Sequence, residues 1–584
     1  MFCRRTEALV LSTILLQSIL TLAILTLDGC SRPRAAVERL GVMPIENLSP
    51  EAQLDWPSRA AAAVVAYDLA GVRNIFAKQV DSLSAAQSMQ ASRVLQGYFF
   101  ERNGRIGIRA TLEELVNSSA VENIEIDGPA SAGFLPLANE LARRLSPDAR
   151  KFGASNENAF RFYGQALAAR DSQDAQRALE QATSADPGFA AGFLDRAKLL
   201  AENGDREHAR QMVEAGERAN PDPMERANLE YVAASASGDV AGRIRALESL
   251  TQATPANANI FVELAEMRFR RRQFQPAAME YRAAARLDPD DPQIWNQLGY
   301  ALARAKDLSG ARRALEQYQK LSPEDPNALD SEGEVNYMRG EFKTAQEFFA
   351  RAAVKNPSEW VKAAEARLML GDRAGADALL AKSGAAGYQM AQWNFLTGRR
   401  KDGLAQMEKL ASESEGDPQA LALSQLAIWK LEMGDNKAAA DLANEAATRA
   451  RSPQAHRIAG LCQHITSGGA GDALALLFAK RFREAIPLLL AGYEESNPSA
   501  DGQLRTLLAW AYVETGAIDQ AAAFIDPYPP PLSSGEPLFA SLIFPRYWSL
   551  RGTVLQHERK IDEAKKSFEL YSKYQDQPEP NATK

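Results

Sequence analysis

The chain has 584 residues and a formal net charge of −8, with acidic and basic residues interspersed. This balance argues against a nucleic-acid binder, which needs a basic stripe to meet phosphates. The three cysteines, Cys3, Cys30 and Cys462, form neither a disulfide framework nor the spacing of a metal site. We therefore expect no metal and no cofactor, and we expect Cys462 to be a small buried thiol.

The first 30 residues read as a signal peptide or a membrane anchor. Arg4 and Arg5 precede the uncharged, apolar stretch 8–27, which is about long enough to span a bilayer. The arginines should stay in the cytoplasm and send the rest of the chain outward. The sequence Leu-Asp-Gly-Cys-Ser around Cys30 resembles the lipobox of bacterial lipoproteins, although Asp28 departs from its small uncharged residue. The resemblance implies acylation of Cys30; an uncleaved signal anchor and a buried helix of a soluble protein remain the alternatives. The two leading readings predict a membrane-anchored protein of the bacterial periplasm or envelope.

Residues 37–146 alternate between strand and helix signals. The Asn103-Gly104 pair is the sharpest of them, because both residues suit the tight turn of a hairpin. This order predicts a small mixed sheet covered by helices, an α+β domain. We expect strands at 39–45, 74–80 and 120–126, helices at 58–69, 83–92 and 134–145, and a hairpin of 94–102 with 105–114.

Two motifs in this domain carry a family resemblance. Residues 41–49 read GVMPIENLS and residues 93–97 read RVLQG. They resemble the amino-terminal domain of TolB-like proteins, in which a strand enters a P-F-x-N-L-S turn and V-L-x-G leads into a basic hairpin. Ile45 replaces the aromatic residue of that pattern, and residues 111–115 lack its usual Asp. The resemblance implies an extracytoplasmic or regulatory interaction module, often joined to helical repeats, and it does not imply an active site.

A proline recurs every 34 residues through the middle of the chain. Proline has no N–H and clashes with the preceding turn of a helix, so each one marks the start of a new unit. A 34-residue period is typical of tetratricopeptide (TPR) repeats, in which each unit is a helix–turn–helix. The prolines in register are Pro187, Pro221, Pro255, Pro289, Pro323 and Pro357.

The unit that starts at Pro292 is the clearest of the array. Trp295, Gly299, Ala311 and Leu315 match the TPR pattern and predict helices at 292–304 and 309–321. Gly299 and Ala311 should be small because the two helices cross there, with Trp295 and Leu315 on either side.

The units are clearest over 156–359, and we expect the array to extend over 156–574 with about ten to twelve units. After Pro357 the phase drifts, but a turn glycine is still followed five residues later by a small residue, as in Gly371 with Ala376. The 467–471 stretch reads as a loop, and the proline-rich 526–531 as a stiff insertion. The tail 575–584 should be disordered. The predicted fold class is mainly α: a solenoid of TPR units preceded by the small α+β domain.

No catalytic motif is present in the sequence. It lacks the H-E-x-x-H, G-x-S-x-G and phosphate-loop patterns, and its four histidines are scattered. We therefore predict a protein that is not an enzyme.

Stacked first helices line the concave face of such a solenoid. Amides, arginines and tyrosines there would suit an extended peptide, because amides satisfy backbone groups and tyrosines give contact area. The alternative is an ordinary wet surface. The candidate groove residues are Asn259, Glu266, Arg270, Asn296, Tyr300, Arg304, Asn327, Asp330, Glu334 and Tyr337.

These observations predict a membrane-tethered scaffold outside the cytoplasm. Its repeats would bind a protein or peptide in the concave groove, and its small domain would dock a second partner. One rival is a signalling input in which the TolB-like domain senses a ligand and the repeats relay it. The other is a hydrolase hidden in the drifted region 385–530, which would need two carboxylates converging in a deep pocket.

Overall fold

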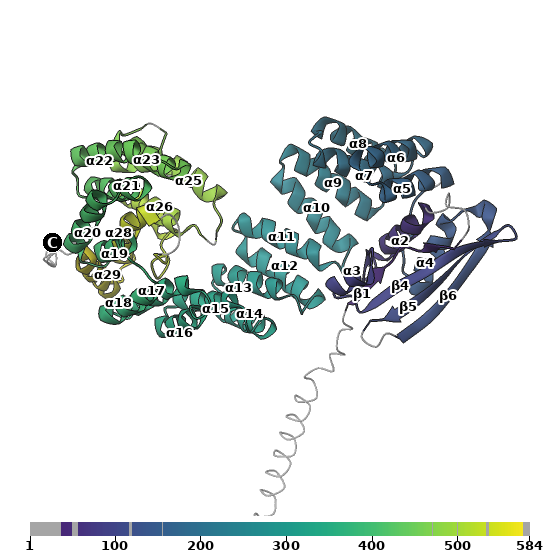
Figure 1. The fold of residues 1–584 in the computed structure, drawn as a ribbon, viewed down its shortest axis with the longest axis horizontal. Coiled ribbons are helices and arrows are strands. Elements are labelled where there is room, and N and C mark those ends of the chain that lie inside the picture. Colours follow the sequence, from purple (N-terminus) through teal and green to yellow (C-terminus); the bar gives the residue numbers. More distant parts are fainter. Residues whose placement is uncertain are drawn as a thin grey trace, which may run out of the picture. The chain divides into compact units, whose positions relative to one another are not determined.

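A computed structural model describes residues 37–48, 56–115, 119–154, 156–469, 471–498, 500–532 and 537–575 (Figure 1). The apolar stretch 8–27, Cys30 and residues 576–584 lie outside the described residues. Within the described ranges, no helix is both long and apolar enough to cross a membrane. Backbone contacts divide the chain into two compact units, Met1–Leu264 with Ala283–Pro289 and Ala265–Arg282 with Asp290–Lys584.

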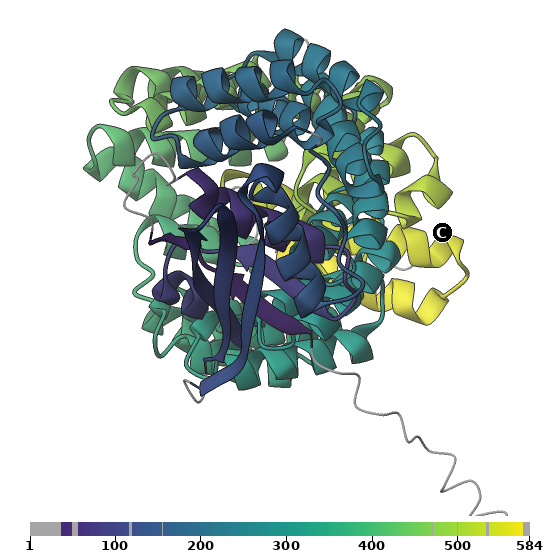
Figure 2. The same cartoon turned by 90° about the vertical axis from the view of Figure 1, so that its right-hand side faces the viewer.

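The small domain of the first unit is one mixed sheet with helices, as the sequence predicts. Its strands, the purple and dark blue arrows of Figure 2, follow the order β3-β1-β4-β5-β6, and the short β2 pairs with β4. β1 is parallel to β3 and β4, whereas β4, β5 and β6 are antiparallel. The strands are β1 (Glu38–Val42), β2 (Glu46–Asn47), β3 (Ile75–Gln79), β4 (Arg93–Arg102), β5 (Arg105–Glu114) and β6 (Ser119–Pro129), and the helices are α2 (Trp56–Leu69), α3 (Leu83–Ser88) and α4 (Leu135–Leu145).

The predicted hairpin is confirmed. β4 and β5 pair in register from Arg93 opposite Glu114 to Arg102 opposite Arg105. The two residues between them, Asn103 and Gly104, have φ angles of 53° and 71°. A two-residue turn with both φ values positive matches the twist of the strands, which is why the Asn-Gly pair is so strong a signal.

The small domain shares one hydrophobic core with the repeats that follow it. This core runs from the sheet through α2 to α5 (Glu157–Ala168) and α6 (Ser172–Ala185). At its centre the ring of Phe152 meets that of Tyr67 from α2 edge-on, with centroids 5.0 Å apart. Edge-to-face aromatic pairs of this kind stabilise by about 0.5–1.5 kcal/mol beyond their buried area. The small domain therefore packs directly against the first repeats of its unit through a shared core.

Asp68, next to Tyr67, is a buried carboxyl beside this core. Its exposed fraction is 0%. Burial raises the pKa of Asp68 to about 8; Asp222 adds to this effect, and the Arg150 guanidinium opposes it. An unfolded Asp titrates near 4. The folded state therefore holds a proton that the unfolded state releases, and the stability of this unit falls as the pH rises from about 4 to about 8.

The rest of the described chain is a row of antiparallel helix pairs. The predicted helices 292–304 and 309–321 are α13 (Pro292–Arg304) and α14 (Leu308–Leu321). α23 (Pro453–Thr466) is the one unpaired member of the row over the described residues. The other pairs are α5/α6, α7 (Ala190–Glu202)/α8 (Arg206–Arg218), α9 (Pro223–Ser237)/α10 (Val240–Ala253), α11 (Ala258–Arg270)/α12 (Phe274–Leu287), α15 (Pro326–Met338)/α16 (Phe342–Ala352), α17 (Trp360–Met369)/α18 (Arg373–Lys382), α19 (Tyr388–Leu396)/α20 (Arg400–Glu413), α21 (Asp417–Glu432)/α22 (Asn436–Arg449), α24 (Ala473–Phe478)/α25 (Phe482–Glu495), α26 (Gly502–Glu514)/α27 (Ile518–Ala522) and α28 (Ala540–His557)/α29 (Ile561–Gln575).

The helix crossings depend on small residues, as predicted. A Cβ atom added to Gly299 would lie 2.6 Å from a methyl carbon of Leu315 in the facing helix, closer than real Cβ contacts come. Ala311 on that second helix has an exposed fraction of 0%. Because packed cores leave no room for a shift of this size, a larger residue at either position would force the pair apart.

In every described pair except α5/α6, the turn between the two helices holds one residue in the left-handed conformation. Gly340, Gly371 and Gly398 take this place with φ angles of 78°, 81° and 88°. Arg272 and Lys306 take the same place in earlier pairs, with φ angles of 57° and 66°. A left-handed backbone costs an L-residue about 1–2 kcal/mol relative to glycine, so these two long side chains stand where glycine would be more stable.

Candidate functional site

Counting back from the left-handed turn residue locates the inner face of the second unit. The residue six positions earlier is Tyr300 for Lys306, Glu334 for Gly340, Glu365 for Gly371 and Gln392 for Gly398. These four polar side chains lie on the first helices α13, α15, α17 and α19. The row combines hydrogen-bond donors and acceptors, which is the chemistry needed to bind a polypeptide main chain.

At one end of the row a lysine binds several carboxylates. Lys362 from α17 lies 2.7 Å from an oxygen of Asp330, 2.9 Å from Glu334 and 3.5 Å from Glu359. The Tyr300 hydroxyl donates to Glu334 over 2.7 Å. Three carboxylates therefore share one ammonium group and one hydroxyl donor.

The charges in this cluster do not cancel. Burial and the negative charge of Glu334 raise the pKa of Asp330, Lys362 opposes both, and together they bring this pKa to about 7. Burial acts to lower the pKa of Lys362, but Glu334 and Asp330 outweigh it and hold that pKa above its usual range. Lys362 is therefore charged at neutral pH, whereas Asp330 is only partly ionised.

Further along the row, the inner side chains bind main-chain groups of the chain itself, at Leu532 and in the short 3-10 helix Pro537–Phe539. The main-chain N–H of Leu532 donates to the Glu365 carboxylate over 3.0 Å. The Gln392 amide donates to the carbonyl oxygen of Pro537 over 2.7 Å. Gln425 on α21 donates to the carbonyl oxygen of Leu538 over 3.1 Å. Three successive first helices thus each supply one hydrogen bond to a main-chain group.

Tyr528 anchors this segment next to the turn of α15 and α16. Its ring meets that of Phe342 edge-on, with centroids 4.9 Å apart at 84°. A Cβ atom at Gly340 would overlap the hydroxyl-bearing end of the Tyr528 ring and would lie 2.6 Å from its Cε2. Gly340 therefore serves two purposes: it allows the left-handed turn and it leaves room for the tyrosine.

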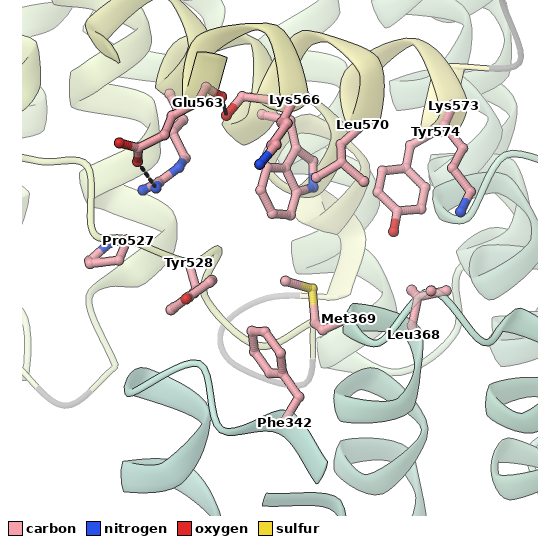
Figure 3. Close-up of a pocket in the computed structure, with 14 residues that line it drawn as sticks. Phe342, Leu368, Met369, Pro527, Tyr528, Glu563, Lys566, Leu570, Lys573 and Tyr574 are labelled. Atoms are coloured by element: carbon pink, nitrogen blue, oxygen red, sulfur yellow. Dashed lines mark hydrogen bonds and ion pairs between the residues drawn. The ribbon is translucent and has the colours of Figure 1, made fainter. Parts of the chain in front are cut away.

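A cavity of about 270 Å³ remains beside Tyr528. Figure 3 shows Phe342, Leu368 and Met369 below it and the side chains of α29 above it. The Lys566 and Lys573 side chains also lie at its wall, together with Glu563 and the buried Trp548. The segment thus lies beside apolar surface that it does not fill.

The last helix pair also packs inside the repeats of this unit. Figure 1 shows α28 within the curve described by α17 to α26. Its aromatic residues Phe544, Tyr547 and Trp548 form one core cluster with residues of α17, α18 and α19, including Leu368 and Trp393. The inner face from α17 to α21 is therefore occupied by the chain itself. The predicted groove residues lie before it, on α11, α13 and α15.

An ion-pair cluster joins two distant parts of the second unit. Arg272 donates to the Asp501 carboxylate over 3.0 Å, and its guanidinium lies 3.6 Å from the centroid of the Tyr493 ring. Arg304 lies 3.5 Å from the same carboxylate, whose residue has an exposed fraction of 2%. The left-handed turn residue Arg272 thus links the α11–α12 turn to the junction of α25 and α26.

The predicted groove residues fall into three groups. Asn259 in the first unit and Glu266, Arg270 and Asn327 in the second are exposed. Tyr300, Arg304, Asp330 and Glu334 are half-buried and belong to the clusters described above. Asn296 and Tyr337 are buried, so they support the packing rather than face a partner.

Sequence reasoning missed Lys362, Glu365, Gln392 and Gln425. All four lie beyond Pro357, where the 34-residue phase drifts. The turn glycines Gly371 and Gly398 still carried the signal, because the inner residue lies six positions before each.

Neither a metal cluster nor a reactive thiol emerges from the described residues. No group of His, Cys, Asp and Glu side chains in them could hold a metal ion. Burial raises the pKa of Cys462 to about 12, so its thiol is not ionised at neutral pH. This residue is the buried thiol that the sequence predicts.

A protein-family model and a curated relative both match the repeats of this chain. The model of the tetratricopeptide repeat family matches residues 262–326 and 296–359. The chain contains TPR repeats. A TPR repeat-containing protein of Pseudomonas aeruginosa is 26% identical over 199 residues, which are 33% of this chain and 34% of that protein. The match thus spans about a third of the length of this curated relative.

Two solved TPR structures are also similar to this chain. One is YrrB, described as a TPR protein with an unusual peptide-binding site; it is 19% identical, the likeness covers 31% of this chain and 94% of YrrB, and the TM-score is 0.28. The other is a TPR protein from Parabacteroides merdae; it is 15% identical, the likeness covers 48% of this chain and 98% of that one, and the TM-score is 0.30.

Proposed function

We propose that this TPR protein is a non-enzymatic scaffold, tethered to the membrane outside the cytoplasm, that binds an extended segment of a protein partner. The observation that carries the binding proposal is the row of main-chain hydrogen bonds from Glu365, Gln392 and Gln425. The three residues lie on successive first helices, and each binds a main-chain group rather than a side chain, which is the chemistry that recognises a polypeptide backbone. The inner positions before them, Glu266 and Arg270, are exposed and continue the row toward α11.

The tether is proposed from the sequence. Arg4 and Arg5 ahead of the apolar stretch 8–27 support an outward-facing chain, and Cys30 supports a lipid on the mature amino terminus. Substitution Cys30→Ser, followed by membrane fractionation and mass measurement of the mature protein, separates the alternatives. An acylated protein loses its lipid mass and is not processed; an uncleaved anchor helix keeps the same mass apart from the substitution.

The small domain is proposed to dock a second partner. Its sequence resemblance to the amino-terminal domain of TolB-like proteins and its mixed α+β sheet support this role. A chain truncated after α4 cannot test it, because the domain shares its core with α5 and α6. The test is instead cross-linking of the whole chain with probes at exposed positions of β6.

The binding proposal is tested by capture of a partner from cross-linked envelopes. The variant Glu266→Ala/Arg270→Ala removes two exposed inner side chains and should reduce recovery of the partner severalfold. The matched control is Arg312→Ala/Glu316→Ala, which removes one acid and one base at the same spacing from the second helix α14. Equal recovery by both variants, or no specific partner for the wild type at low salt, would overturn the proposal.

A further inference from the structure

We infer that residues Asp526–Leu532 are an intramolecular ligand of the TPR inner face, and that the partner's binding segment has the same chemistry: an acidic residue, an aromatic residue and consecutive prolines in an extended chain. This inference rests on the proposed function, because it names the kind of partner that the inner face takes.

The contacts of this segment, through its main chain and one aromatic side chain, are those of a bound peptide. Its main chain contacts the repeats at both ends: Leu532 N–H donates to Glu365, and the carbonyl oxygen of Asp526 accepts from Arg551 over 3.1 Å and from the Tyr547 hydroxyl. The Asp526 carboxylate receives Arg505 over 2.9 Å. Between these ends lies the anchor residue Tyr528.

The sequence of the segment suits this mode of binding. Asp526-Pro-Tyr-Pro-Pro-Pro-Leu532 contains four prolines, which lack N–H groups and hold φ near −65°. Such a chain is already extended before it binds, so little conformational entropy is lost when it docks. Its only main-chain N–H groups after Asp526 are those of Tyr528 and Leu532, and the second of these is the one bound by Glu365.

The fit of the segment is incomplete, which is expected of a ligand that can be displaced. The cavity of about 270 Å³ lies directly beside Tyr528 and is lined by Leu368, Met369 and Leu570 together with charged side chains such as Lys566 and Lys573. Apolar surface that stays in contact with water lacks the stabilisation that burial would bring. A partner with a larger side chain at or next to the aromatic position would fill this space, and so would bind more tightly than the chain's own segment does.

Tethering makes up for the incomplete fit. A segment attached to its own binding site has an effective concentration on the order of mM. A free peptide of the same sequence must compete with it, so the wild-type protein should bind such a peptide weakly. Loosening the tethered segment, with the groove left intact, should expose the site.

The test is fluorescence anisotropy with a dye-labelled peptide of residues 525–532 and the full chain. The variant Tyr528→Ala/Leu532→Pro removes the anchor ring and the N–H bound by Glu365, and should bind the peptide at least tenfold more tightly than the wild type does. Adding Gly340→Ala to this variant should abolish the gain by filling the tyrosine site. Adding Gly434→Ala should not, because Gly434 has a similar left-handed strain, nothing lies within 4 Å of its Cβ, and it does not line the cavity.

Equal peptide affinity of the wild type and the double variant would overturn the inference, as would equal effects of the two glycine substitutions. If the double variant does not fold, hydrogen exchange of the wild type decides: excess peptide should speed exchange at the Leu532 amide, and an unchanged rate would refute displacement. Failure of this inference can be distinguished from failure of the proposed function. A partner whose capture depends on Glu266 and Arg270 but not on Gly340 would leave the scaffold standing and remove only the intramolecular ligand.

Discussion

Gly340→Ala isolates the contact between the turn of α15 and α16 and the segment held on the inner face. The variant has two costs. The left-handed φ of 78° costs an L-residue about 1–2 kcal/mol. The new methyl group also overlaps Tyr528 and must move its ring off Phe342, which forfeits about 0.5–1.5 kcal/mol of aromatic pairing. The second cost falls on the segment alone.

Gly434→Ala is the matched control for the first cost. Its φ of 85° is close to that of Gly340, it lies in the turn of α21 and α22 away from the cavity, and its added Cβ meets nothing within 4 Å. Native-state hydrogen exchange at the Leu532 amide reports the free energy of local opening of the segment. We expect exchange about 2- to 10-fold faster in Gly340→Ala than in Gly434→Ala, which is the aromatic pairing energy converted to a ratio of rates. Equal rates would show that Tyr528 does not hold the segment in place.

Three further predictions concern the stability of the fold and are checked by thermal unfolding of the whole chain. Asp68→Asn should raise the unfolding temperature at pH 8 more than at pH 5, because it removes a carboxyl that folding keeps protonated; an identical gain at both pH values would contradict the raised pKa. Lys362→Met should cost about 3 kcal/mol by leaving the half-buried carboxylates of Asp330 and Glu334 without their cation, whereas Lys355→Met, at an exposed pair, should cost less than about 1 kcal/mol. Gly299→Ala should destabilise by about 1–3 kcal/mol through its clash at the helix crossing. Gly460→Ala, also within a helix but with open space around its Cβ, should stabilise by about 0.5–1 kcal/mol, and the same sign for both would refute the crossing argument.

The repeat architecture could be predicted from the sequence because its signals are local. Prolines that start each unit, turn glycines and small residues at the crossings act within one helix pair, and α13 and α14 lie where these residues place them. The Asn103-Gly104 turn likewise determines its hairpin from two residues. The exposed inner positions Glu266 and Arg270 follow from the same period.

The occupied inner face could not be predicted in this way. The bonds from Glu365 to Leu532 and from Gln392 to Pro537 join residues 167 and 145 positions apart. Which side chains meet over such separations depends on the curvature accumulated over many stacked pairs, and no local pattern encodes that sum. The sequence by itself determined that helix pairs form and where they begin. Only the tertiary structure decided that the pairs of the second unit curve around their own carboxyl-terminal segment, because that outcome depends on the packing of the whole row.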